Sequence, residues 1–146
     1  MDRMLIGNSE FCCLPDLGIT KLPIRVDTGA HTSSLHVDNL RTIQIDGEPH
    51  VSFDLHPDMY DLAHTVHCTA PLHDSRAIKS SNGQVQKRSV IQTTLRLGGQ
   101  EWPIQLTLTN RKSMTYMMLF GREGMGNRVY VDPSAEYLLG QPQPKA

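Results

Sequence analysis

The clearest pattern in the chain is an alternation of apolar and polar residues over residues 90–97 and again over residues 102–109. Successive side chains of a strand point to opposite faces, so each segment predicts a strand with one face in the core. Gly98 and Gly99 separate the two segments and predict an antiparallel hairpin. The apolar face of the second strand consists of Trp102, Ile104, Leu106 and Leu108.

Shorter segments of mixed apolar and polar residues predict the remaining strands. These segments are residues 4–14, 21–26, 34–37, 40–45, 51–55, 66–72, 116–120 and 129–131, and residues 137–139 are expected to pair at a sheet edge. The dipeptides Asp46-Gly47 and Asn82-Gly83 favour tight hairpin turns. Residues 123–127 predict one short helical turn, and residues 56–63 and 111–115 predict loops. The fold class is therefore mostly β, a small closed barrel with one short helix.

Length and composition are consistent with this picture. The chain has 146 residues, which fit a single domain over residues 1–140, and the Gln- and Pro-rich residues 141–146 predict a disordered tail. The formal net charge is −1, so neither nucleic acid nor an anionic membrane surface is an expected partner. No segment approaches the roughly 20 apolar residues of a membrane span, and the first residues lack the apolar run of a signal peptide. We therefore expect a cytoplasmic location.

The three cysteines include the adjacent pair Cys12 and Cys13, which could bridge each other only with strain. An odd number of cysteines without a signal peptide is typical of a reducing compartment. We expect all three to behave as small buried hydrophobic residues.

The stretch Ile24–Ala30 ends a predicted strand in Asp27-Thr28-Gly29, and small and hydroxyl residues follow it. Gly29 lets the backbone pass close to the Asp27 carboxylate, and Thr28 supplies a hydroxyl that can bond to a neighbouring loop. Asp27 could also be an ordinary turn residue, because Asp, Thr and Gly are common in turns. A second segment, Met117–Arg122, carries apolar residues followed by Gly121-Arg122.

An Asp-Thr-Gly-Ala loop followed far downstream by an apolar-apolar-Gly-Arg segment resembles one subunit of a retropepsin, the viral type of aspartic protease. The resemblance covers about residues 5–140 and extends to a bacterial and archaeal family commonly labelled ATP-dependent zinc proteases, which is better described as retropepsin-like. The segments that carry it are Ile6-Gly7, Leu14–Gly18, Val26–Ala30, Thr32–His36, Ile78–Gly83, Arg88, Val90–Thr93, Leu106–Arg111, Met114, Leu119–Glu123 and Val131–Ser134.

The resemblance implies an aspartic peptidase in which water attacks a peptide or amide bond of a peptide or protein substrate. That chemistry needs two carboxylates about 3 Å apart that share one proton. The chain has one Asp-Thr-Gly, so the second carboxylate must come from a symmetric partner, and we expect a homodimer. The Gln- and Pro-rich end of the chain suits a terminal sheet poorly, so this dimer is expected to be weak. A binding module that holds peptides or proteins without cleaving them is the alternative.

The expected site residues fall into two groups. The catalytic group is Asp27, Thr28 and Gly29, and the substrate-binding group is Ala30, His31, Lys79, Ser80, Asn82, Arg88 and Arg122. The polar hairpin around Asn82-Gly83 is the expected flap, where Lys79, Lys87 and Arg88 would face a substrate, although they could equally be ordinary surface charges. Some members of the family look like partners of ATP-grasp glutamate ligases and process glutamate tails on a ribosomal protein. For such a tail, Arg25 and Arg111 would be further carboxylate-binding candidates.

One position departs from the viral pattern. The residue after Asp-Thr-Gly-Ala is commonly Asp in viral retropepsins and pairs with the Arg of the Gly-Arg segment, whereas this chain has His31. Arg122 must then find another acceptor, such as Glu123, Asp132 or a backbone carbonyl.

The chain offers weak support for the zinc and ATP of the family label. His64, His67, Cys68 and His73 form the nearest cluster of zinc-ligand types, but His67 and Cys68 would point to opposite faces of a strand. We therefore predict no metal site. The Gly-x-x-x-x-Gly-Lys loop of ATP-binding proteins is absent, and we expect no cofactor.

Overall fold

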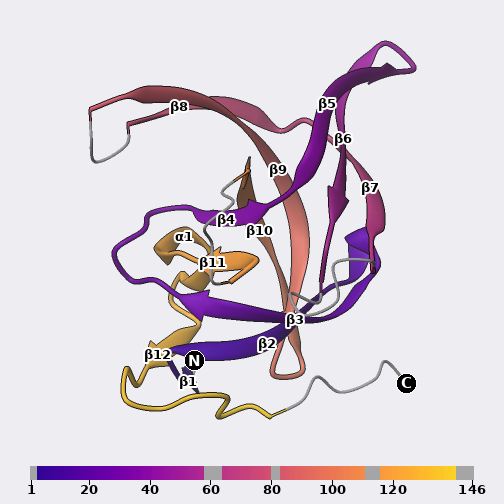
Figure 1. The fold of residues 1–146 in the computed structure, drawn as a ribbon. Helices are drawn as coiled ribbons and strands as arrows, with labels where there is room; N and C mark the ends of the chain where they lie inside the picture. Colours follow the sequence, from indigo (N-terminus) through magenta and orange to yellow (C-terminus); the bar gives the residue numbers. More distant parts are fainter. Residues whose placement is uncertain (1–2, 58–63, 80–82, 111–115, 141–146) are drawn as a thin grey trace.

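The computed structural model describes residues 3–57, 64–79, 83–110 and 116–140 (Figure 1). Within these residues, six strands close into a barrel in the order β10-β4-β11-β3-β2-β9, because β9 also pairs with β10. They are β2 (Ser9–Leu14), β3 (Ile19–Val26), β4 (Ser33–His36), β9 (Val85–Leu97), β10 (Gln100–Thr109) and β11 (Met118–Phe120). The predicted fold class, a mostly β closed barrel, is confirmed.

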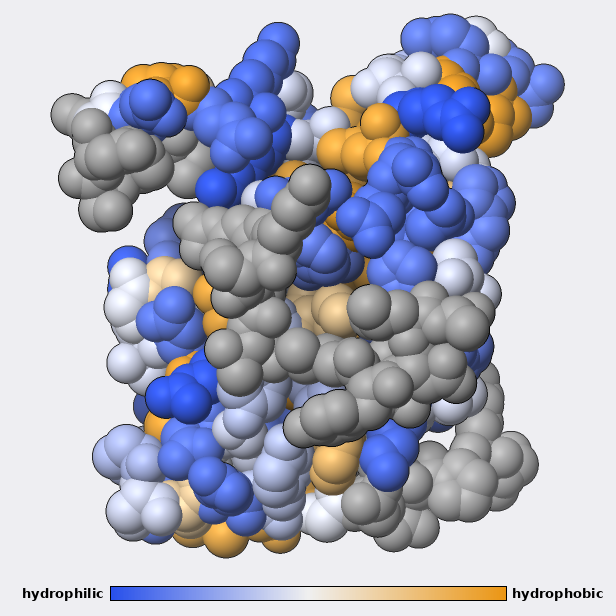
Figure 2. All heavy atoms as spheres, in the orientation of Figure 1, coloured by the Kyte–Doolittle hydropathy of each residue, from blue (hydrophilic) through white to orange (hydrophobic). Residues whose placement is uncertain are grey.

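Two hairpins project from the barrel as separate arms (Figures 1 and 2). One is formed by β8 (Asp74–Lys79) and the first half of β9, which pair antiparallel from Asp74 opposite Val90 to Lys79 opposite Val85. The other is formed by β5 (Asp38–Ile45) and β6 (Glu48–Leu55), to which β7 (Val66–Pro71) adds a third strand. Its predicted turn is confirmed, since Asp46 and Gly47 both have positive φ angles, 52° and 79°.

The barrel core is built from the apolar faces that the alternation predicts. In the β9–β10 hairpin, Leu95 lies opposite Trp102 and Ile91 lies opposite Leu106. Phe53 and Phe120 are the largest fully buried side chains of the core. Each such apolar side chain contributes on the order of 1.5–3 kcal/mol by leaving water, so the patterned strands account for most of the drive toward this fold.

The predicted strand over residues 4–14 is wrong in one respect, because it is broken at Gly7. β1 (Met4–Ile6) leaves the barrel and pairs in parallel with β12 (Val129–Val131). The carboxyl-terminal segment crosses at the break, where the Asn8 amide donates to the carbonyl of Ala135 at 2.7 Å. A Cβ at Gly7 would lie 2.4 Å from that same carbonyl oxygen, so only glycine permits the crossing.

The expectation that residues 137–139 pair at a sheet edge is also wrong. This segment forms a turn in which Tyr137 has a φ of +52°. Its amides are bonded instead to β2, where the Tyr137 amide donates to the Ser9 carbonyl and the Leu138 and Leu139 amides donate to the Glu10 carboxylate.

The remaining elements are short. The predicted helical turn is present as α1 (Arg122–Met125), and the 3-10 turn η1 (Pro15–Leu17) joins β2 to β3. The predicted loop at residues 111–115, most of the loop at 56–63 and the predicted tail at 141–146 lie outside the described residues. No helix in the described part of the chain is long and apolar enough to cross a membrane.

Candidate active site

The Asp27 loop follows the end of β3, at the left of the barrel in Figure 1. Backbone hydrogen bonds hold it on both sides: the Val26 amide donates to the Asn8 carbonyl at 2.8 Å, and the Asp27 amide donates to the Phe120 carbonyl at 2.9 Å. The Asp27 side chain is half-buried, and its Oδ1 accepts a hydrogen bond from the Gly29 amide at 3.0 Å. The tight turn therefore presents one oriented carboxylate near the surface.

Gly121 allows the segment Met117–Arg122 to pack closely against the Asp27 loop. The Gly121 amide donates to the Ser33 hydroxyl at 3.0 Å. A Cβ on Gly121 would lie 2.8 Å from the Thr32 carbonyl carbon and 3.0 Å from the Ala30 carbonyl oxygen. Both are backbone atoms that cannot move aside cheaply, so the close packing of the two segments requires glycine. The predicted adjacency of the Asp27 and Gly121 loops is confirmed.

Arg122 donates to backbone carbonyls, because this chain has His31 at the position where viral retropepsins commonly carry the Asp that pairs with this Arg. Its Nη1 donates to the Thr28 carbonyl at 2.9 Å, and its amide donates to the Ala30 carbonyl at 2.9 Å. Of the three acceptors that the sequence left open, the structure selects the backbone carbonyl. Glu123 serves elsewhere, since its Oε1 accepts from the Gln105 amide at 3.0 Å. At least one donor of Arg122 is thus used to shape the loop rather than to meet a substrate.

The Thr28 and His31 side chains are exposed beside Asp27. Among the described residues, no side chain or backbone group bonds to the Thr28 hydroxyl. Ala30 is half-buried where the loop turns back, and its amide donates to the Asp27 carbonyl at 3.2 Å. The rim of the loop is therefore polar and open to a substrate or to a second copy of the chain.

The expected flap is the β8–β9 hairpin. Lys87 and Arg88 lie on its β9 strand opposite Ala77 and Arg76. Lys79 ends β8, with its side chain outside the described part of the structure, and Ser80 and Asn82 lie outside the described residues altogether. Gly83 has a φ of +86°, as the predicted turn requires.

Arg88 and Lys87 line a cavity of about 190 Å³ at the base of this hairpin. Its other walls come from the start of β5 and the end of β10, including Asn39 and Asn110. The pattern of apolar and polar residues did not predict that these strands meet. Asp38 joins them, accepting from Asn110 Nδ2 at 3.1 Å and bonding to His56 Nε2 at 2.9 Å.

Comparison with known proteins places the chain in a family. Residues 5–142 match the RimB-like family, described as the retropepsin-like aspartic endopeptidase RimB. This chain belongs to the RimB-like family. The resemblance inferred from the Asp-Thr-Gly and Gly-Arg segments is thereby confirmed.

The RimB-like region also occurs within longer proteins. The chain is 48% identical over 140 residues to a probable alpha-L-glutamate ligase of Shewanella halifaxensis, covering 96% of this chain and 31% of that protein. It is 45% identical over 139 residues to a probable alpha-L-glutamate ligase of Desulfotalea psychrophila, covering 95% and 30%. The chain therefore spans about a third of the length of these curated relatives.

A solved structure has the same architecture. The crystal structure of a protein of unknown function from Legionella pneumophila superposes with a TM-score of 0.80 at 27% identity, covering 94% of this chain and 99% of that one. The RimB-like fold of this chain is thus the fold of an experimentally determined relative.

The histidine and cysteine side chains that could serve as zinc ligands do not lie together in this RimB-like chain. The exposed His67 ring bonds through Nδ1 to Asp54 Oδ1 at 2.8 Å, whereas Cys68 is buried on the other face of β7. Burial raises the pKa of the Cys68 thiol to about 11, and the charge of Asp54 adds to this shift. His73 lies apart from both, at a cavity that Asp16 and Pro71 also line. Among the described residues, no three metal-binding side chains lie together.

Proposed function

We propose that this RimB-like chain is an aspartic peptidase that hydrolyses a peptide or amide bond with the Asp27 carboxylates of two copies. The observation that carries the proposal is the fixed position of the Asp27 loop. The Asp27 amide donates to the Phe120 carbonyl, and hydrogen bonds from Gly121 and Arg122 hold the rest of the loop. A general base must be held in a fixed direction to act on water. The hydrogen bonds of the Asp27 loop supply that orientation for the Asp27 carboxylate.

The second carboxylate is the reason for proposing a dimer. Among the described residues, the Asp27 carboxylate has one hydrogen-bond partner, the Gly29 amide. In a symmetric dimer, two such loops would bring two carboxylates together, and the pair would share one proton because both cannot ionise at close range. One carboxylate then activates water while the other protonates the scissile carbonyl oxygen. The exposed Thr28 hydroxyl would join the two loops.

The terminal sheet supports a weak rather than a tight dimer. β1 and β12 pair with each other within the chain, and in the described structure neither has a second neighbour. Leu5 and Tyr130 lie opposite each other there and are 53% and 57% exposed. Their apolar side chains and the free strand edges could join a second copy, but two three-residue strands offer little area.

Polypeptides rich in glutamate are the substrates we propose. The relatives of this family that carry the glutamate ligase name connect the domain with glutamate. In this chain, Lys87 and Arg88 line the cavity at the base of the flap, and Arg88 could bind a carboxylate through two parallel hydrogen bonds. Arg25 is also exposed, on the strand that leads to Asp27, with its guanidinium 6.0 Å from the centre of the Tyr116 ring.

The test compares the wild-type chain with Asp27→Asn on a peptide pool that includes glutamate-rich chains. The substitution keeps the shape of the side chain and removes its ionisable oxygen, so cleavage should be lost while the fold persists. Asp46→Asn, at the exposed tip of the β5–β6 hairpin, is the matched control and should cleave normally. Equal cleavage by wild type and Asp27→Asn would exclude Asp27 as the catalyst. Binding without cleavage by either form would favour a binding module.

Assembly is tested beside activity. Sedimentation velocity over a concentration series should show a weak monomer–dimer equilibrium, and activity should rise more steeply than linearly with enzyme concentration. Thr28→Ala should weaken the dimer with little loss of monomer stability. A strictly monomeric protein with activity linear in concentration would rule out the shared pair of carboxylates.

A further inference from the structure

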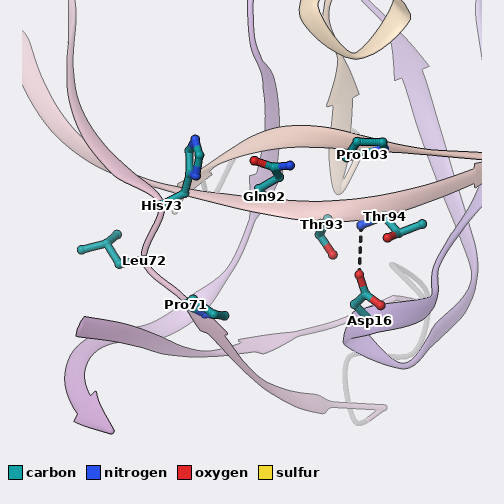
Figure 3. Close-up of a pocket in the computed structure, with 8 residues that line it drawn as sticks. All are labelled: Asp16, Pro71, Leu72, His73, Gln92, Thr93, Thr94 and Pro103. Carbon is teal, nitrogen blue, oxygen red and sulfur yellow. Dashed lines mark hydrogen bonds between the residues drawn. The ribbon is translucent and has the colours of Figure 1, made fainter. Parts of the chain in front are cut away.

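A second cavity, of about 460 Å³, lies between β9, the β7–β8 connection and η1 (Figure 3). Its polar lining includes Asp16, His73, Gln92 and Thr93, and Pro71 and Pro103 supply apolar walls. This volume is in the range of small-molecule sites, about 300–1,000 Å³.

The cavity is separate from the candidate active site. Asp16 lies in η1 just before β3 begins, and Asp27 follows the last residue of β3. Eight strand residues at about 3.3 Å each place the two carboxylates at opposite ends of the strand, roughly 25 Å apart. A ligand in this cavity would not contact Asp27, so the inference does not depend on the proposed peptidase activity.

Thr93 is the observation that first points to a ligand. It occupies the row of core positions on β9 that Ile91 and Leu95 also occupy, and it is only 5% exposed. Its hydroxyl oxygen has no hydrogen-bond partner among the described residues. Figure 3 shows this oxygen directed toward the space between Asp16 and Pro71. A buried hydroxyl without a partner is unfavourable, so valine would suit the bare fold better at this position.

The charge of the cavity indicates which ligand could provide that partner. The Asp16 carboxylate is exposed, and its Oδ2 accepts from the Thr94 amide at 3.1 Å, leaving Oδ1 available (Figure 3). The exposed Gln92 side chain lies on the other face of β9 from Thr93 (Figure 3). Among the described residues, the lining contains the Asp16 carboxylate and the His73 ring but no Lys or Arg side chain. Its acceptors therefore favour a ligand that carries positive charge and several N–H donors.

We propose that this cavity binds a protonated amino or guanidinium group carried on a short apolar chain. The cationic head would donate to Asp16 and the Thr93 hydroxyl, since an ammonium has three donors and a guanidinium five. The apolar chain would lie against Pro71. Lysine and arginine side chains of a polypeptide and free aliphatic amines share this chemistry.

Binding is measured by NMR chemical-shift titration of the full chain with N-acetyl-lysine methylamide and N-acetyl-arginine methylamide. The apolar isostere N-acetyl-norleucine methylamide and the anionic N-acetyl-glutamate methylamide are the control probes. We expect saturable shifts at the cavity residues with at least one cationic probe and none with either control. Binding of norleucine as tight as that of lysine, binding of the glutamate probe, or no binding by either cation would overturn the proposal.

Two variants separate a ligand site from a structural feature. Asp16→Asn keeps an oxygen for the Thr94 amide but removes the charge, and it should weaken cation binding at least about tenfold. Thr93→Val should weaken binding several-fold while the urea midpoint of unfolding stays the same or rises. Asp46→Asn and Asp27→Asn should bind as the wild type does. Unchanged affinity in both Asp16→Asn and Thr93→Val would refute the proposed site.

The source of the cation is resolved by a final comparison. Cadaverine represents a free amine, and the pentapeptide Gly-Gly-Lys-Gly-Gly, with both ends capped, represents a polypeptide. Tighter binding of the peptide would indicate a lysine side chain of a protein, and tighter binding of cadaverine would indicate a small amine. Binding of neither would contradict the proposal.

Discussion

Glu10 is the residue whose replacement tests the structure most directly. Its side chain is fully buried on β2, although a glutamate in a short strand is ordinarily a surface residue. The carboxylate accepts hydrogen bonds from the Gly7 and Leu138 amides at 2.8 and 3.0 Å through Oε2, and from the Leu139 amide at 3.1 Å through Oε1. It thereby ties the carboxyl-terminal segment to β2, whose first residue, Ser9, pairs with Arg25 on β3.

The size of the effect follows from these three bonds. A hydrogen bond to a charged group contributes about 1.5–3 kcal/mol, and part of this is offset by the cost of burying the carboxylate. Glu10→Ala would leave three amides without their acceptor and should lower the free energy of unfolding by about 3–5 kcal/mol. That is a large share of the ~5–15 kcal/mol typical of a domain. Glu10→Gln keeps one acceptor oxygen and should lose roughly half as much.

The assay is equilibrium urea unfolding, with amide hydrogen exchange as a second readout. A loss of about 3 kcal/mol would lower the midpoint urea concentration by roughly 1–3 M, because the free energy of unfolding of a small protein falls by about 1–3 kcal/mol per molar urea. Exchange at Leu138 and Leu139 should accelerate before the barrel amides do, because these two amides lose their acceptor. Glu48→Gln, at the exposed start of β6, is the control and should be within about 0.5 kcal/mol of wild type.

Two results would refute this account. A Glu10→Ala variant as stable as Glu48→Gln would show that the three hydrogen bonds to Glu10 contribute nothing to the free energy of unfolding. A destabilised Glu10→Ala variant with unchanged protection of the Leu138 and Leu139 amides would show that Glu10 acts through something other than these bonds.

Three further predictions follow from the same structure. Gly121→Ala should destabilise the fold by about 2–4 kcal/mol in urea unfolding, because its Cβ would meet the backbone of Thr32 and Ala30; wild-type stability would contradict the packing. Cys68, with a pKa of about 11, is about one part in a thousand thiolate at pH 8, so its alkylation by iodoacetamide should be far slower in the native protein than in urea, and equal rates would show that the thiol is accessible. The Ser134 hydroxyl and amide hold the pKa of Asp132 below its usual range, so its contribution to stability is complete above about pH 4 and is lost as the pH falls through the lower folded value. Urea midpoints measured between about pH 6 and pH 2 should therefore fall less steeply for Asp132→Asn than for wild type, and parallel curves would argue against the shift.

Much of the fold follows from local patterns in the chain. The alternation over residues 90–97 and 102–109 predicts the β9–β10 hairpin with the correct faces, since apolar side chains of a strand leave water together. Asp46-Gly47 predicts the β5–β6 turn because both residues tolerate positive φ. The Asp27 and Gly121 motifs predict that two distant loops meet.

The errors fall where one segment is shaped by another that is far away in the sequence. The break at Gly7 depends on the approach of Ala135, and residues 137–139 find their acceptors on Glu10 and Ser9 rather than on a sheet edge. The local preference of a segment for strand or turn does not predict such a crossing. The hydrophobic alternation marks which face of a strand is buried but not which backbone passes over it.

The same division holds for the sites. The class of fold, the single Asp-Thr-Gly loop and its Gly-Arg support could be predicted from the sequence, because they depend on short motifs with fixed backbone requirements. The bond from Arg122 to the Thr28 carbonyl and the position of Thr93 at a cavity beside Asp16 became visible in the three-dimensional structure. Hydrogen-bond partners of polar side chains are chosen by three-dimensional proximity across a closed barrel, and the order of residues along the chain does not contain that proximity.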